Sequence, residues 1–177
     1  KLDGNWLINI LKAFTVALMG LLAQLKANAG SIFKEKVGTV GSIMLWDTPA
    51  HIRYNVRVMC DNSGLTYAQK VVICACISVE SGFQNYYPNG KPVTNKNMNS
   101  DGTLSSTDWG VVQCNDRWNI GKGRPFPSVE YVMANPQKMV QWMIDLSKVG
   151  KLTLWSSYKF GAYKRRLLAE SVRAIPY

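Results

Sequence analysis

One glutamate in the sequence combines a position and a set of neighbours that suit proton donation. Glu80 ends an apolar stretch and is followed closely by Phe83. Burial among apolar side chains disfavours a charged carboxylate, and so does the negative end of a helix dipole. Both effects raise the pKa of a glutamate and keep it protonated closer to neutral pH. A general acid that protonates a glycosidic oxygen needs this property, whereas an exposed glutamate at a helix end is the plainer interpretation.

A second carboxylate, Asp108, lies in polar surroundings within the stretch Ser105–Gly110. The three residues before it carry hydroxyl groups, and hydrogen bonds from such groups favour an ionised carboxylate. The two carboxyl groups therefore occupy opposite environments, one apolar and one polar. Retaining glycosidases use such a pair, in which one acid donates a proton while the other carboxylate attacks or stabilises the anomeric carbon. Turn capping is the alternative role for this aspartate.

The residues just after Asp108 have side chains that suit contacts with sugars. Amide groups can hydrogen-bond sugar hydroxyl and N-acetyl groups, and an indole ring can stack on a pyranose. The stretch supplies Gln113, Asn115, Arg117 and Trp118. Loop capping and core packing suit the same residue types. This stretch therefore indicates a sugar site only in combination with the two carboxyl groups, Glu80 and Asp108.

Together these residues resemble the active-site segment of the c-type lysozymes. That family carries Glu-Ser-x-Phe at the end of a catalytic helix, then Asn-x-Asn-x-Asp-Gly, Ser-Thr-Asp-aromatic-Gly and Gln-x-Asn-x-Arg-Trp. The matching stretches here, in the same order, are Glu80–Phe83, Asn97–Gly102, Ser106–Gly110 and Gln113–Trp118. Each motif is short, but four of them in one order form a specific joint signal for the lysozyme-like superfamily.

The resemblance implies an enzyme that cleaves peptidoglycan between N-acetylmuramic acid and N-acetylglucosamine. Glu80 would be the general acid, and Asp108 the nucleophile or the stabiliser of the cationic sugar. Trp155 lies in a stretch similar to the family's Ala-Trp-x-x-Trp helix, and it would pack beside Glu80 and help to keep it protonated. No metal or other cofactor is implied. The implied substrate-binding residues are Asn99, Asp101, Gln113, Asn115, Trp118 and Trp155.

The chain also departs from this family. The similarity covers about residues 65–160, the loop between Phe83 and Asn97 is longer, and Thr103–Ser105 is inserted before the aspartate motif. The family's disulfide framework is not reproduced. Glu-Ser-Gly-Phe is also similar to lytic transglycosylases, which cleave the same strand with one glutamate and form an anhydro-sugar. A lysozyme-fold binding or structural module without activity is the third hypothesis.

The elements that must position these residues form an α+β domain in which helices dominate. Thr66 and Gln69 have the spacing of a capping box, which predicts a helix from Tyr67 to about Ser81. Gly82 follows where a left-handed helix end is expected. Residues 52–60 are expected to form a loop or a short helix.

The middle of the chain has turn signals in place of helix signals. Residues 83–112 are rich in Asn, Gly, Pro, Ser and Thr, with turns predicted at Asn89-Gly90 and Asp101-Gly102. A small antiparallel sheet fits this composition.

Two further helices are predicted after the sheet. Asn135 and Pro136 have the residue types of an N-cap and a first helical position. The helix after them carries an apolar stripe of Met139, Val140, Met143, Leu146 and Val149, and Gly150 ends it. A last helix is predicted over residues 153–172, with a solvated basic face at Lys164, Arg165 and Arg166.

The composition suits a folded, basic protein. The chain has 177 residues, 47% of them apolar, and a formal net charge of +10 from 21 basic and 11 acidic side chains. Such a surface favours polyanionic partners, namely nucleic acid, anionic lipid or cell wall. Bacterial peptidoglycan is the expected partner because of the residues described above, and no specific nucleic-acid contact is expected.

The cysteines do not have the spacing of a zinc site. Cys74 and Cys76 are separated by one residue, and the single histidine, His51, provides no imidazole cluster. Cys60 and Cys114 complete the set of four. Buried free thiols are the expected state, and one or two disulfides remain the alternative.

The chain divides into an apolar segment at residues 1–30, a glycine-punctuated connector at 31–45 and a catalytic domain at 46–177. Residues 6–25 are expected to be helical and are nearly long enough to span a bilayer. A helix packed on the domain or on partner subunits, a membrane-inserted helix and an uncleaved signal peptide all remain open. The expected setting is extracellular, in the cell wall or periplasm, or on a virion, as in a phage-associated lysozyme.

Overall fold

The computed structural model of the chain describes residues 44–173. These described residues belong to one compact unit. The expected N-terminal helix, and with it the alternatives for residues 6–25, lies outside the described residues. None of the helices in residues 44–173 is long and apolar enough to cross a membrane.

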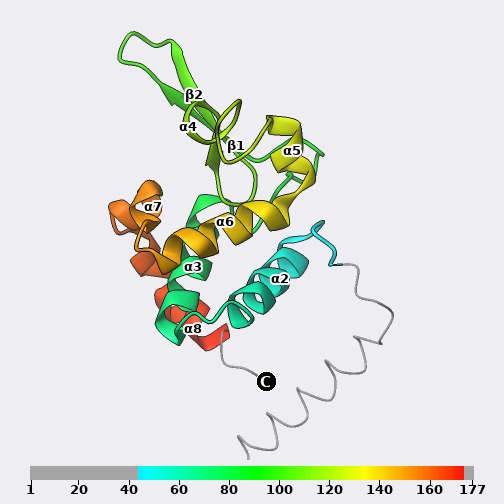
Figure 1. Cartoon of the computed structure of the whole chain (residues 1–177), viewed down its shortest axis with the longest axis vertical. Helices are drawn as coiled ribbons and strands as arrows, with labels where there is room; N and C mark the ends of the chain where they lie inside the picture. The colour runs from blue at the N-terminus through cyan, green and yellow to red at the C-terminus, as the bar shows by residue number, and fades with distance from the viewer. Residues whose placement is uncertain (1–43, 174–177) are drawn as a thin grey trace, which may run out of the picture. The chain divides into compact units, whose positions relative to one another are not determined.

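The described part is an α+β structure, as expected, in which short helices pack together and a small antiparallel sheet lies at one end of them (Figure 1). Its strands are β1 (Thr94–Met98), β2 (Leu104–Trp109) and β3 (Cys114–Asn115). Two short 3-10 helices, η1 (Leu152–Leu154) and η2 (Ala162–Arg166), interrupt the C-terminal part. The α-helices are α2 (Pro49–Asp61), α3 (Tyr67–Glu80), α4 (Asp116–Asn119), α5 (Val129–Ala134), α6 (Pro136–Lys148), α7 (Ser156–Lys159) and α8 (Leu167–Arg173).

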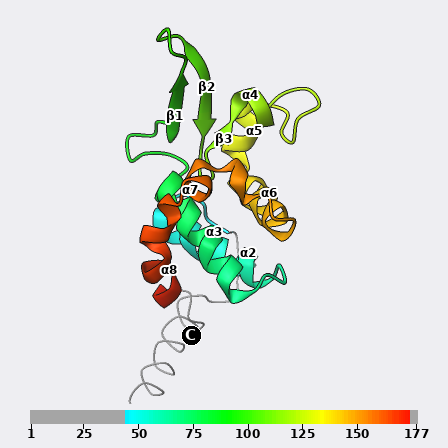
Figure 2. The same ribbon diagram turned by 90° about the vertical axis from the view of Figure 1, so that its left-hand side faces the viewer.

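Helix α3 runs through the middle of the helical part and contacts α2, α6, α7, α8 and η2 (Figure 2). The predicted capping box is confirmed, since the Thr66 side chain accepts from the Gln69 N–H and the Gln69 side chain accepts from the Thr66 N–H. Gly82 has the predicted positive φ, +63°. A helix surrounded on several sides is apolar on most of its surface. Its last residue, Glu80, therefore lies at the edge of the core.

The first described helix is longer than the sequence indicated. α2 spans residues 49–61, where a loop or short helix was expected, because Thr48 caps it and Pro49 begins it. The Thr48 side chain accepts a hydrogen bond from the His51 N–H at 3.2 Å. Ile52 and Val56 bury the inner face of the helix in the core.

Helix α6 begins at Pro136 as predicted, but Asn135 does not cap it with its side chain. The Asn135 amide instead donates to the Tyr131 carbonyl at 2.8 Å and so ends the preceding helix. The predicted apolar stripe is buried at its start and ends in solvent, since Val149 is 64% exposed. Including Val149 in the core was therefore wrong.

The predicted continuous helix over residues 153–172 was also wrong. Gly161 has a left-handed backbone, φ +76°, and divides the segment into α7, η2 and α8, after the short turn η1. Such a conformation ends a right-handed helix and strongly favours glycine. The break turns residues 156–162 toward the cleft described below and leaves Lys164, Arg165 and Arg166 exposed, as expected.

The sheet has the order β1-β2-β3 and is antiparallel throughout. Strands β1 and β2 form a hairpin that extends away from the helices (Figure 1). Its register pairs Asn95 with Asp108 and Asn97 with Ser106, and β3 pairs Asn115 with Asp108 on the other side. Both predicted turns are present, with positive φ at Gly90 and Gly102.

All four cysteines are buried free thiols, as expected, so the disulfide alternative is wrong. Cys76 and Cys114 lie in the core, where burial raises the pKa of each thiol to about 12. A thiol with such a pKa stays protonated and behaves as a small apolar side chain.

Candidate active site

A cleft of about 870 Å³ separates the sheet from the helical segments that follow α6. Glu80 and Asp108 both line it, one from the end of α3 and the other from β2. The structure therefore brings together the two carboxyl groups that the sequence singled out. The helical wall also includes Trp155, Ser157 and Phe160, and the sheet wall includes Asn95, Asn97 and Asn115.

Glu80 is half-buried, and the backbone N–H of Ser157 donates a hydrogen bond to its Oε1 at 3.2 Å. Within residues 44–173 it takes part in no ion pair. Burial raises its pKa, hydrogen bonding from Ser157 opposes this change, and the nearby negative charge of Asp108 raises the pKa further. The expected protonated general acid is consistent with these surroundings.

Asp108 is held by amide groups and not by the hydroxyl groups that the sequence indicated. Its Oδ1 accepts from Asn115 Nδ2 at 2.7 Å, and its Oδ2 accepts from Asn97 Nδ2 at 2.9 Å. Asn95 Nδ2 is a weaker donor to Oδ2 at 3.4 Å. These neutral donors match the acceptor-only carboxylate and orient it without neutralising its charge.

A hydroxyl group contributes indirectly to this arrangement. Ser106 Oγ accepts from Asn97 Nδ2 at 3.2 Å and from Asn115 Nδ2 at 2.9 Å. Both asparagines are thereby bound to β2 at two points. Their amides are fixed before any ligand arrives, which is the condition for a preorganised site.

The register of the hairpin explains why these asparagines meet Asp108. Residues two apart in a strand face the same side, so Asn95 and Asn97 lie on one face of β1, opposite Asp108 and Ser106 of β2. Neither Asn95 nor Asn97 was among the site residues that the sequence predicted. Their spacing by two within a polar strand was the available signal, but strand pairing could not be read from it.

Asn99 and Asp101, which were expected to bind substrate, are not among the residues that line the cleft. They lie at the tip of the hairpin, where Asn99 Nδ2 donates to Thr103 Oγ1 at 2.9 Å. Asp101 Oδ1 accepts from the N–H and the hydroxyl of Thr103, at 2.9 and 2.6 Å. The structure therefore does not bring Asn99 and Asp101 to the cleft, and their contact with substrate stays a prediction.

Gln113 and Asn115 line the cleft as expected, but their amides are already used by the protein. Gln113 is buried with φ +54°, and its Nε2 donates to the Gly110 carbonyl at 2.8 Å and to the Val93 carbonyl at 3.3 Å. Asn115 Nδ2 serves Asp108. Both residues therefore shape the sheet wall, and the amides hold strands and carboxylate in place.

Trp118 and Trp155 both line the cleft, as predicted, but in different ways. Trp118 is 59% exposed, and the guanidinium of Arg117 lies 5.2 Å from its ring centroid. Trp155 is 5% exposed, its Nε1 donates to the Val112 carbonyl at 2.6 Å, and its ring contacts that of Trp142. The guanidinium of Arg124 lies 6.0 Å from the Trp118 ring centroid. Trp118 is thus an exposed ring at the cleft, whereas Trp155 is a buried, apolar part of the wall that Glu80 shares.

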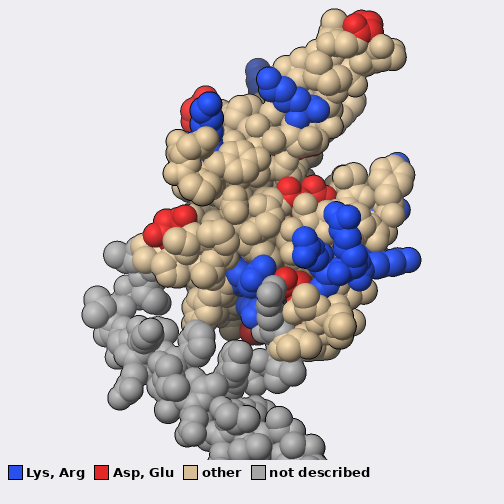
Figure 3. Space-filling view, turned by 180° about the vertical axis from the view of Figure 1, so that it is seen from behind, with Lys and Arg blue, Asp and Glu red and all other residues tan. Residues whose placement is uncertain are grey.

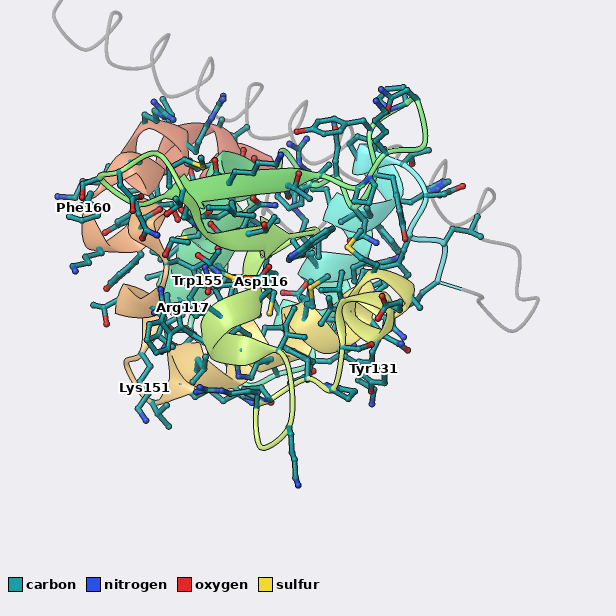
Figure 4. The ribbon with its side chains drawn as sticks, turned by 90° about the horizontal axis from the view of Figure 1, so that it is seen from above. Asp116, Arg117, Tyr131, Lys151, Trp155 and Phe160 are labelled. Carbon is teal, nitrogen blue, oxygen red and sulfur yellow. The ribbon has the colours of Figure 1, made fainter. Side chains whose placement is uncertain are left out.

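Helix α4 is attached to the sheet by its first residue, which sets the position of Trp118. Asp116 Oδ1 accepts from the Thr107 N–H at 2.9 Å, and Asp116 Oδ2 accepts from Trp109 Nε1 at 3.2 Å. Figure 4 shows Asp116 and Arg117 on this helix, with Trp155 toward the inside of the molecule and Phe160 at its edge.

Two exposed aromatic residues of the cleft were not singled out from the sequence. Tyr87 comes from the long loop after Phe83, and Phe160, 77% exposed, comes from the turn after α7. Exposed rings are common on protein surfaces, so neither residue carried a signal by itself.

The described residues contain no group of three or more His, Cys, Asp or Glu side chains placed to hold a metal ion. The polar groups that face the cleft are carboxyl, amide and hydroxyl groups. Comparison of the chain with models of known protein families and with characterised proteins found no match.

Proposed function

We propose that this protein is a glycoside hydrolase that cuts the glycan strands of bacterial peptidoglycan, a muramidase. One observation carries the proposal. Glu80 and Asp108 line the same open cleft. Glu80 is desolvated and pairs with no cation in the described part of the chain, whereas Asp108 accepts hydrogen bonds from amide groups. Two carboxyl groups whose environments differ in this way are suited to acid and nucleophile roles.

In the first step, protonated Glu80 donates its proton to the glycosidic oxygen between two sugars. The bond from that oxygen to the anomeric carbon breaks, and the departing strand leaves with a hydroxyl group. The Asp108 carboxylate attacks the anomeric carbon or stabilises its positive charge. The amides of Asn97 and Asn115 hold the carboxylate in place during this step.

In the second step, ionised Glu80 removes a proton from a water molecule. The resulting hydroxide bonds to the anomeric carbon, Asp108 is released as a carboxylate, and Glu80 is again protonated. The Ser157 N–H stabilises Glu80 during the interval in which it is charged. The product is a strand with a reducing end.

The cleft also carries groups that suit a chain of N-acetylated sugars. The rings of Tyr87, Trp118 and Phe160 are exposed along it and can stack on pyranose faces. The basic net charge favours the acidic cell wall. On this proposal the protein acts on the wall, as a secreted or periplasmic enzyme or as part of a virion.

The test is digestion of purified peptidoglycan, with mass analysis of the released fragments. Wild-type protein is expected to release fragments with reducing ends, and Asp108→Asn is expected to lose most of this activity. Asp101→Asn is the matched control, because Asp101 belongs to the same hairpin but not to the cleft. Anhydro ends would contradict hydrolysis and identify a lytic transglycosylase that uses Glu80 alone. Absence of cleavage by a folded wild-type protein would indicate a binding or structural module.

A further inference from the structure

A cluster of four cations, which we call the basic rim, lies on the segment formed by α7 and η2. It consists of Lys159, Lys164, Arg165 and Arg166, all of them exposed. Figure 3 shows Lys and Arg side chains gathered over this segment. Residues 159–166 contain no acidic residue that could offset their charge.

The charges of the basic rim are not compensated within the part of the chain that the structure describes. No ion pair or side-chain hydrogen bond joins any of its four residues to a described residue. Other cations of the same domain do have partners, such as Lys70 with Asp61 at 2.8 Å and Lys148 with Asp145 at 3.5 Å. The basic rim is therefore available to a negatively charged ligand.

The basic rim adjoins the cleft through the residues that lie between its members. Phe160 and Ala162 line the cleft, and Gly161 turns the chain between them. Lys159 Nζ lies 5.3 Å from the Phe160 ring centroid. The Lys164 side chain folds back toward Gly161, where its Cε would lie 3.6 Å from an added Cβ. At least two ammonium groups thus lie at the border of the cleft.

We infer that the basic rim binds the carboxylates of the peptide stems that peptidoglycan carries on its muramic acid residues. This inference rests on the proposed function and adds a second recognition element to it. A strand in the cleft is neutral along its sugar backbone, but each stem leaves the backbone and carries several carboxylates. A cation group at the border of the cleft can meet those carboxylates while Phe160 contacts the sugars.

The continuity with the cleft favours this ligand over an anionic membrane. A membrane surface would be met by a broad basic face, whereas the basic rim borders a concave surface lined with aromatic and amide side chains. Each exposed ion pair is weak, and three of them together correspond to about a tenfold change in affinity.

The test compares a variant of the basic rim, Lys164→Gln with Arg165→Gln and Arg166→Gln, with a control that loses the same charge elsewhere. The control is Lys138→Gln with Lys148→Gln and Lys151→Gln, which are exposed and do not line the cleft. Cleavage is measured on strands that keep their stems and on strands from which an amidase has removed them. Binding of both strands is measured with the same substitutions in a Glu80→Gln background, which does not need cleavage.

We expect the rim variant to lose about tenfold in kcat/KM and in affinity on stem-bearing strands, and little on stripped strands. The control should keep the wild-type ratio between the two substrates. Equal losses on both substrates, or equal losses in variant and control, would overturn the inference. The inference would also be overturned if the rim variant kept the wild-type ratio between the two substrates but no longer bound phosphatidylglycerol vesicles. If wild-type protein binds stems through the rim but cuts neither strand, the proposed function fails and the inference holds.

Discussion

Two glutamates of this domain are withdrawn from water, and their partners differ completely. Glu170 of α8 has a side chain that is 1% exposed, and its two oxygens lie 3.6 Å from Arg53 and 3.3 Å from Arg57 of α2. Glu80 of α3 receives one backbone N–H and pairs with no cation in the described part of the chain. The first carboxylate joins α8 to α2 through its two ion pairs. The second carboxyl group has a raised pKa because it is buried, which favours its protonated form.

One aromatic side chain lies beside an arginine that pairs with Glu170, and it follows Glu80 closely in the chain. Arg53, which pairs with Glu170, lies 4.4 Å from the ring centroid of Phe83. Phe83 is fully buried and has φ +62°, an uncommon conformation for a residue other than glycine. The ion pair therefore supports the turn that follows Glu80 without touching Glu80. Substitutions of the two glutamates should accordingly separate catalysis from stability.

The largest effect is expected for Glu80→Gln. It removes the transferable proton, and general acids contribute about a hundredfold to ten-thousandfold to a rate. We expect a loss of this size in the rate of peptidoglycan cleavage, with thermal unfolding no lower than that of wild type. A cleavage rate close to wild type would contradict the role of Glu80 and remove the basis of the comparison.

Glu170→Gln should have the opposite signature. It removes the charge of a buried carboxylate that two arginines share, so we expect a loss of about 2–3 kcal/mol in the free energy of unfolding. Denaturant unfolding measures this loss, and cleavage below the transition should be retained. Glu130→Gln, on the surface of α5, is the control and should change stability little. A Glu170→Gln protein that is stable but inactive would show that the two glutamates are not separate in function.

A smaller effect is expected at the amides that hold Asp108. Asn97→Ala removes the 2.9 Å hydrogen bond to Oδ2 and should lower kcat by about tenfold with little change in KM, since hydrogen bonds to charged groups are worth about 1.5–3 kcal/mol. Asn95→Ala removes a longer contact of 3.4 Å and should cost less. Asn99→Ala, at the hairpin tip, should leave the rate unchanged. The reverse order among these three would contradict the observed register.

The smallest effect concerns the pH dependence of stability. The folded-state pKa of Glu80 is raised above the ordinary value of 4.5, so the folded protein binds this proton more tightly than the unfolded chain does. Stability is therefore lost as pH rises from about 4.5 through the folded-state pKa. Glu80→Gln has no such loss and should unfold at a higher temperature than wild type near neutral pH. Thermal scans should show the difference disappearing below pH 4.5; a difference that grows on acidification would contradict it.

The features that the sequence predicted correctly depend on contacts between near neighbours. The capping box of α3, the positive φ of Gly82 and the turns at Gly90 and Gly102 each involve residues within a few positions of one another. The unequal surroundings of Glu80 and Asp108 were visible for the same reason, because their nearest neighbours differ in polarity. These features made the α+β class and the two carboxylates predictable.

The features that were missed depend on contacts between distant parts of the chain. The residues around Asp108 do not indicate that Asn97 and Asn115 donate hydrogen bonds to it. Strand register follows from pairing and not from composition. Asn99 and Asp101 were assigned to the site by the resemblance alone, and the structure places them at the hairpin tip. The same lack of non-local information joined α7, η2 and α8 into one predicted helix, where Gly161 and the packing around Glu80 impose a break.

The sequence by itself thus determined which residues have the chemistry: a glutamate at the end of an apolar helix, an aspartate in a polar strand and aromatic rings near both. The tertiary structure decided which of them meet. It brings the Ser157 N–H to Glu80 and the Asn97 amide to Asp108, and it positions the basic rim beside the cleft. The reason is physical, since helix caps and turns are stabilised within one stretch of chain, whereas a cleft exists only where separate stretches pack.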